Sequence, residues 1–300
     1  MSDFLGCALY WLCFLNSIIH SLFMIDRYKM TIQPVISLLT DFGLTDEYVG
    51  VMKGVITSIC FQSPMIIDIT HGIQPQNIIQ AALILDASYS FFPQHTIHTI
   101  VVDPGVGSQR KTLMLEQEGY CFVAPDNGVL SLVCQKNVSR RIFQINAPHL
   151  YLHPVSHTFH GRDIFAPISA HLANGISLTE IGSEIDISQL SLIDLPKPYQ
   201  EDPFSLWGKV IAVDHFGNLI TNIKPSHLQA INGMDNLSSI SIQNDHFIIN
   251  GISESYQNVP VGSFLAIFAS RGYLEIAVNC GNAFEKINRQ LIDINLRATQ

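Results

Sequence analysis

Short apolar runs alternate with amphipathic segments over the first two thirds of the chain. Five runs have the length and composition of buried strands, at 35–40, 65–70, 95–102, 112–117 and 120–124. Three segments have helical spacing, at 76–89, 128–135 and 163–174. Another helix is expected from Thr45, because a threonine before two acidic residues is typical of an N-cap with an acidic first turn. This alternation predicts an α/β fold with a mostly parallel sheet flanked by helices.

The pattern changes at a proline-rich, polar stretch, residues 196–206. Beyond it, strand-like runs separated by turn residues lie at 208–214, 218–223, 238–243, 246–251, 263–270 and 273–279. We therefore expect an α/β domain over 34–195, a linker over 196–206 and a smaller all-β domain over 207–300. The last would be a barrel or a sandwich.

The first 33 residues stand apart from both expected domains. Residues 4–25 are nearly uncharged and long enough to span a bilayer, but no basic region precedes them and no signal-type cleavage site follows. Arg27 and Lys29 would keep the main body on the cytoplasmic side. Two interpretations stay open: an inner-membrane anchor at 4–25, or a true start at Met30 that makes 1–29 an upstream extension. Both place the folded domains in the cytoplasm.

Composition narrows the classes of function. A net charge of −9 argues against nucleic acid as the main partner, because phosphate binding needs clustered Lys and Arg. Six cysteines without CxxC spacing are typical of a reducing compartment and do not form a zinc or disulfide framework. His157 and His160 have no third ligand at a suitable spacing, so no metal site is expected.

Polar residues at the ends of the predicted strands are the first candidates for a site. Asp41, Asp68, His71 and Asp103 all lie at such ends, and ligands of open α/β sheets bind beyond the carboxyl ends of the strands. A carboxylate there can bind paired sugar hydroxyls, and a turn or helix cap explains a single aspartate equally well.

Two loops of the α/β domain add further candidates. In "DPGVGSQR" (103–110), glycines allow the backbone to approach a ligand, and Arg110 follows; the spacing matches neither GxGxxG nor a P-loop. In "HTFHGRD" (157–163), His160 stands at a helix entrance, where Asp163 favours the helix N-terminus and Arg162 would pair with it.

Seven blocks then occur in an order that resembles one family. They are "LLTDFGLTDEYVGVMKG", "DITHGIQPQNI", "VVDPGVGSQR", "APDNGVLS", "TFHGRDIFAPISAHL", "DHFGNLITNI" and "SRGYLEIAVNCGNA". Over about residues 34–285 the chain resembles the S-adenosylmethionine (SAM) hydroxide adenosyltransferase family, whose relatives include SAM-dependent chlorinases and fluorinases.

The resemblance implies an enzyme that hydrolyses SAM to adenosine and L-methionine, by attack of water or hydroxide on ribose C5′. SAM is then a substrate, and no cofactor or metal is expected. Asp103, Arg110 and His160 match the catalytic set of members that use water. Fluorinases have an aromatic hydroxyl at the position of Asp103 and lack the histidine. Halide adenosylation and non-catalytic binding of an adenosyl ligand are the alternatives.

The resemblance also implies how the substrate is bound. Asp41 matches the ligand of both ribose hydroxyls, and Asp214 and Ser270 match groups that bind the methionine end. Apart from the resemblance, Ser270 and Arg271 form a turn between two apolar strands that could bind a carboxylate, since a guanidinium fork fits a carboxylate.

The remaining matched positions concern adenine and the assembly. Asn218 and the backbone near Cys280 would contact adenine, between aromatic walls formed by Phe216 and Tyr256. Gln76 stands where fluorinases carry an indole, and its role is left open. The family's site lies between two subunits, which implies a homotrimer.

Overall fold

The computed structural model describes residues 33–135, 138–229, 231, 236–288 and 292–298. The apolar run at 4–25 lies outside these residues, so the prediction made for it stays a prediction. Within the described part of the chain, no helix is long and apolar enough to cross a membrane.

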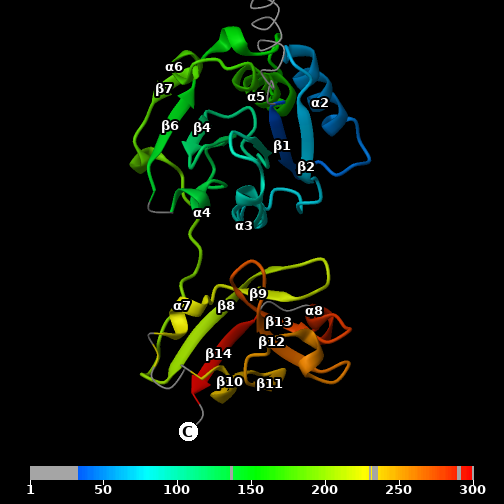
Figure 1. Cartoon of the computed structure of the whole chain (residues 1–300), viewed down its shortest axis with the longest axis vertical. Coiled ribbons are helices and arrows are strands. Elements are labelled where there is room, and N and C mark those ends of the chain that lie inside the picture. The colour runs from blue at the N-terminus through cyan, green and yellow to red at the C-terminus, as the bar shows by residue number, and fades with distance from the viewer. Residues whose placement is uncertain (1–32, 136–137, 230, 232–235, 289–291, 299–300) are drawn as a thin grey trace, which may run out of the picture.

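A seven-stranded sheet forms the centre of the N-terminal domain (Figure 1). Its strands, in spatial order, are β2 (Met65–Thr70), β1 (Val35–Thr40), β3 (Ile97–Val101), β5 (Tyr120–Pro125), β4 (Thr112–Gln117), β6 (Arg140–Ile145) and β7 (Gly182–Glu184). Pairing is parallel from β2 through β5 and antiparallel from β5 through β7. The expected α/β fold is confirmed, and its parallel half brings the ends of β1, β2 and β3 to one edge.

Helices cover both faces of this sheet, because alternate apolar residues of each buried strand point to opposite sides. On one face lie α2 (Tyr48–Ile59) and α5 (Ala166–Ala173), packed on strand residues such as Leu38 and Val123. On the other lie α3 (Ile78–Ser88) and α4 (Ser131–Cys134), packed on Leu39 and Phe122.

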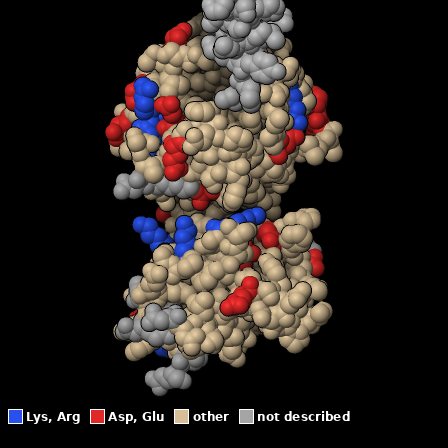
Figure 2. Space-filling view, in the orientation of Figure 1, with Lys and Arg blue, Asp and Glu red and all other residues tan. Residues whose placement is uncertain are grey.

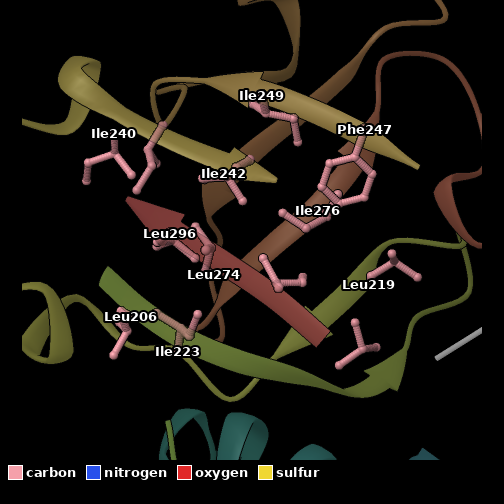
Figure 3. Packing of buried hydrophobic residues seen from close by; sticks show 14 of the residues in the cluster. Leu206, Leu219, Ile223, Ile240, Ile242, Phe247, Ile249, Leu274, Ile276 and Leu296 are labelled. Atoms are coloured by element: carbon pink, nitrogen blue, oxygen red, sulfur yellow. The ribbon is translucent and has the colours of Figure 1, made fainter. Parts of the chain in front are cut away.

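The C-terminal domain is an antiparallel β structure, as expected. Its strands, in spatial order, are β11 (Phe247–Asn250), β10 (Ile240–Asn244), β14 (Asp293–Ala298), β8 (Ser205–Val213), β9 (Leu219–Thr221), β13 (Leu274–Val278) and β12 (Phe264–Phe268). A bridge between Ser253, just after β11, and Ile267 of β12 nearly closes the sheet into a barrel. Isoleucine, leucine and phenylalanine side chains fill its interior (Figure 3).

Short helices connect these elements. They are η1 (Tyr89–Phe91), η2 (Pro148–Leu150), η3 (Gly161–Phe165, a π-helix), α6 (Leu178–Ile181), η4 (Ile187–Gln189), α7 (Pro225–Leu228), η5 (Leu237–Ser239), η6 (Tyr256–Asn258) and α8 (Ala283–Lys286).

The two domains meet through a small apolar contact. Leu83 of α3 and Leu132 of α4 pack in one cluster with Ile220 of β9 and with Tyr273. Figure 1 shows α3 and α4 on the side of the N-terminal domain that faces the barrel. Figure 2 shows that most of this face of the molecule carries no charged side chain, which agrees with the charged fraction of 14%.

One predicted helix start is wrong. Helix α2 begins at Tyr48, three residues after Thr45, and its N-cap Glu47 makes no capping hydrogen bond with its side chain. The preceding segment is bound to the residue that follows β2, since the Gly43 amide donates to the carbonyl oxygen of His71 at 2.8 Å. That loop contributes to the candidate site.

Candidate active site

A pocket of about 280 Å³ opens at the carboxyl ends of β1 and β3. Its lining comes from the loops after β1 and β3, the segment before α3 and the loop before η3, and includes Asp41, Gln76, Asp103, Phe159 and His160. Neighbouring parallel strands end at one edge, so residues distant in sequence meet there.

Asp103 and Arg110 form a nearly buried ion pair, with exposed side-chain fractions of 5% and 10%. Arg110 Nε donates to Asp103 Oδ1 at 2.8 Å and to Oδ2 at 2.9 Å, and Nη2 donates to Oδ2 as well. Nη1 donates to Thr112 Oγ1 at 2.8 Å. Because a planar guanidinium held at several points has little freedom, the carboxylate is fixed in one orientation at the pocket wall.

His160 is the third member of this cluster. Its Nδ1 lies 3.0 Å from Arg110 Nη2, and a guanidinium can only donate, so we assign the proton of the neutral ring to Nε2. Burial, followed by the positive charge of Arg110, lowers the pKa of His160 from its ordinary value. The imidazole is therefore neutral near pH 7.

Gly107 allows the two loops of this cluster to approach each other. Its φ is +77°, and a Cβ at this position would overlap the carbonyl oxygen of His157. Any other residue would push the 103–110 loop away from the loop that carries His160. The glycine thus fixes the position of Asp103 and Arg110 relative to His160.

Asp41 lines the same pocket, and the structure shows what Gln76 does for it. The Gln76 amide donates to Asp41 Oδ2 at 2.8 Å, from a residue with a φ of +66°. Gln76 is not a glycine, so this backbone conformation costs energy and is held in place by its surroundings. No sequence pattern signals this contact, because it comes from the backbone.

Two other strand-end residues, Asp68 and His71, lie next to the Asp41 loop and do not belong to the described pocket lining. The predicted pairing of Arg162 with Asp163 is confirmed: Nε donates to Oδ1 at 2.6 Å, and the Ser156 amide donates to Oδ2 at 2.8 Å. Burial alone would raise the pKa of Asp163, but these hydrogen bonds outweigh it and lower the pKa. Asp163 is fully buried and has a structural role.

The C-terminal candidates form a second group around a turn after β8. Asp214 Oδ1 accepts the amides of Phe216 and Asn218 at 2.9 and 2.8 Å, and Oδ2 accepts from Asn218 Nδ2 at 2.9 Å. Gly217, with a φ of +84°, lets this turn pack on Asn282. The rings of Phe216 and Tyr256 remain 72% and 40% exposed.

Glu275 belongs to this group, and the sequence pattern did not reveal it. It is buried in β13, and burial, followed by the charge of Asp214, raises its pKa, with Arg271 opposing the rise. The same two carboxylates, after burial, raise the pKa of Tyr256. The signal was an acidic residue inside an otherwise apolar strand, "YLEIAV".

Ser270 and Cys280 lie at opposite ends of the β13 hairpin strand, Ser270 in the turn before it and Cys280 after it with an exposed thiol and a φ of +53°. Among the described residues, no hydrogen bond or ion pair links the Asp214 group to the Asp103 cluster. Asp214 instead lines a cavity of about 360 Å³ together with Gln74 and Asn77. The described residues also contain no group of three or more His, Cys, Asp or Glu able to hold a metal ion.

Comparisons with known proteins agree in pointing to one family. Residues 36–182 match the model for the SAM hydroxide adenosyltransferase N-terminal domain, and residues 208–293 match the model for the C-terminal domain. Proteins named (R)-S-adenosyl-L-methionine hydrolase from Methanocaldococcus jannaschii and Thermus thermophilus are 34% and 33% identical. These alignments cover 87% and 83% of this chain and 95% and 93% of the relatives.

One solved structure is similar to this chain in fold and in sequence. A crystal structure of an uncharacterized conserved protein from Thermotoga maritima superposes with a TM-score of 0.78 at 36% identity, covering 87% of this chain and 99% of that one. Proteins named fluorinase also match, at 26% identity.

Proposed function

Because the chain belongs to the SAM hydroxide adenosyltransferase family, we propose that its pocket hydrolyses S-adenosyl-L-methionine to adenosine and L-methionine. One observation carries the proposal for the site: Arg110 is hydrogen-bonded to both Asp103 and His160, at a pocket that Asp103, His160 and Asp41 line. The relatives' names specify the (R) form of the sulfonium substrate, and we extend that preference to this chain.

The reaction is a displacement at ribose C5′. An oxygen of water or hydroxide forms a bond to C5′ as the C5′–S bond breaks, and its electron pair returns to sulfur to give neutral methionine. The sulfonium charge activates the leaving group, so no general acid is needed. The enzyme must align the nucleophile and remove its proton.

We propose that the three residues divide these tasks. The Asp103 carboxylate faces the pocket and is the acceptor for the proton of water. His160, protonated on Nε2, donates a hydrogen bond and holds the oxygen in line. Arg110 binds both of them from behind, and its charge favours the deprotonated form of the nucleophile.

The halide alternative is disfavoured by the same carboxylate. A fluoride or chloride ion bound beside Asp103 would meet a negative charge, whereas water can donate a hydrogen bond to it. A non-catalytic binder would have no use for a buried Asp–Arg–His cluster, because burying such charges costs free energy.

We propose that Asp41 binds the ribose hydroxyls and that the remaining ligands come from a neighbouring chain in a homotrimer. The C-terminal candidates Asp214, Phe216 and Tyr256 do not line the pocket that contains Asp103, and both aromatic residues are exposed, Phe216 to 72% and Tyr256 to 40%. We further propose a cytoplasmic location, which suits the free cysteines in the described part of the chain.

The test is product analysis with the purified protein. Incubation with SAM, alone and with chloride or fluoride, should give adenosine and methionine in every case. A 5′-halo product would show that the enzyme transfers the adenosyl group to halide and would contradict the proposed hydrolysis. Tight binding of SAM without turnover would favour a non-catalytic binding protein.

Mixing tests the assembly. Asp103→Ala chains, which lose kcat, and Asp214→Ala chains, which bind SAM weakly, should recover activity at low SAM when unfolded and refolded together, because some sites then join two intact halves. Each variant refolded alone is the control. No recovery, or a monomer in light scattering, would contradict the shared site.

A further inference from the structure

We propose that Thr40 and His71 are positioning residues for Asp41 and thereby set the enzyme's preference for a ribose over a deoxyribose substrate. The inference rests on the proposed role of Asp41 as the ribose ligand. It is carried by a chain of polar contacts that runs from α2 through β2 to the residue just before Asp41.

In the buried part of this series of polar contacts, the donor and the acceptor of each hydrogen bond can be assigned. His71 Nδ1 lies 2.8 Å from Thr40 Oγ1, and both residues are buried, His71 with an exposed fraction of 4%. Thr40 Oγ1 accepts the Phe42 amide at 3.3 Å, so its own hydrogen is free to go to Nδ1. Nδ1 is then the acceptor, and the ring N–H is the one on Nε2.

The other side of the ring faces a carboxylate that is itself held. His71 Nε2 lies 3.1 Å from Asp68 Oδ1, close enough for the carboxylate to attract the ring N–H. Lys53 Nζ of α2 binds Asp68 Oδ2 at 2.6 Å. A negative charge beside Nε2 favours the tautomer that leaves Nδ1 as the acceptor for Thr40.

His71 also holds the Asp41 loop by its backbone. Its carbonyl oxygen accepts the Gly43 amide at 2.8 Å, so one residue binds the chain on both sides of Asp41. Gln76, five residues later, donates its amide to Asp41 Oδ2. The loop therefore has little freedom to rotate, and a carboxylate that must meet two hydroxyls needs that rigidity.

An apolar pair would fill the same space as Thr40 and His71, but it would not orient the turn. A buried hydroxyl and imidazole are retained at the cost of desolvation, which their mutual hydrogen bond offsets. The polar pair fixes the orientation of the turn, because Thr40 can bind the Phe42 amide and His71 together only in one arrangement of the turn.

Matched variants separate positioning from packing. Thr40→Val removes the hydroxyl at nearly constant volume, and Thr40→Ser keeps it. His71→Gln loses the acceptor near Thr40, whereas His71→Asn keeps an amide oxygen close to the place of Nδ1. The measurement is kcat/KM for SAM and for its 2′-deoxyribose analogue, with Asp41→Ala as the reference.

The unchanged protein should prefer the ribose substrate by about tenfold or more, as expected for one hydrogen bond to a charged group. Thr40→Val and His71→Gln should reduce this preference roughly fivefold by weakening the ribose substrate selectively, while Thr40→Ser and His71→Asn stay within about twofold. Melting temperatures identify any variant that does not fold. If one residue's variant fails to fold, the two variants of the other residue provide the test.

Two failures are distinguishable. If Asp41→Ala leaves the preference intact, Asp41 does not bind ribose and the proposed site fails along with this inference. If Asp41→Ala abolishes the preference but Thr40→Val and His71→Gln slow both substrates equally, the pair only packs and the inference alone is overturned.

Discussion

The N-terminal and C-terminal candidate groups are built alike, but their side chains differ in how far they are buried and held by hydrogen bonds. Around Asp103 the charged side chains are nearly buried and bind one another. Around Asp214 the side-chain hydrogen bonds of the carboxylate stay within one turn, and Phe216 remains mostly exposed. In each group a glycine with positive φ lets a second loop pack closely, Gly107 against His157 and Gly217 against Asn282.

This difference in burial and hydrogen bonding suits the Asp103 group to the chemical step and the Asp214 group to substrate recognition. Groups that stabilise a developing charge act best when they are held before the substrate arrives, and the Asp103 cluster is held in this way. Aromatic walls can stay exposed until a ligand or a neighbouring chain covers them. Changes in the first group should therefore lower kcat, and changes in the second should raise KM.

Asp103→Ala should produce the largest effect. Loss of the proton acceptor should lower kcat by about 100- to 10,000-fold while KM changes little, because general-base catalysis contributes on this scale. Steady-state kinetics with SAM is the measurement. Equal losses in kcat and in substrate affinity would assign Asp103 to binding and remove the contrast between the two groups.

Gly107→Ala should separate the loops of the Asp103 cluster. Positive φ and overlap with the His157 carbonyl together should lower the free energy of unfolding by about 2–4 kcal/mol, with a loss of kcat. Gly175→Ala is the control, since Gly175 also has positive φ but a Cβ there would meet no described atom within 4 Å. Equal destabilisation in thermal melts would show that only backbone strain matters at Gly107.

The pH dependence should report His160. Burial and Arg110 lower the pKa of His160, so the ring stays neutral from above pH 6.5 down to that lowered pKa. The value of kcat/KM should therefore fall only at a pH below 6.5. The unfolded state binds the proton first as pH decreases, so stability should also fall from about pH 6.5 downward. His160→Asn should lose this acid limb; an unchanged limb would assign it to another group.

Phe216→Ala should have the smallest effect on the fold. The ring is 72% exposed, so the free energy of unfolding should change by less than about 0.5 kcal/mol. KM should rise while kcat stays near the original value. A fall in kcat without a change in KM would contradict the recognition role of the C-terminal group.

The sequence pattern could predict the parallel strands and the edge where Asp41 and Asp103 lie, since adjacent parallel strands end together. It predicts the wrong start for α2, because a local capping pattern does not show that the chain before the helix is bound to His71, and the helix begins only at Tyr48. The sequence could not predict the contact from the Gln76 backbone amide, because every residue except proline carries such an N–H. The sequence does not identify Glu275 as a site residue, because one acidic residue in an apolar run still fits the pattern of a strand.

Oxygen labelling tests the central claim most directly. Turnover of SAM in water enriched in oxygen-18 should place the label in the 5′-hydroxyl of adenosine and leave methionine unlabelled, because the new bond forms between a solvent oxygen and C5′. Adenosine without label, or label in methionine, would contradict displacement at C5′ by a water molecule held at the Asp103 cluster.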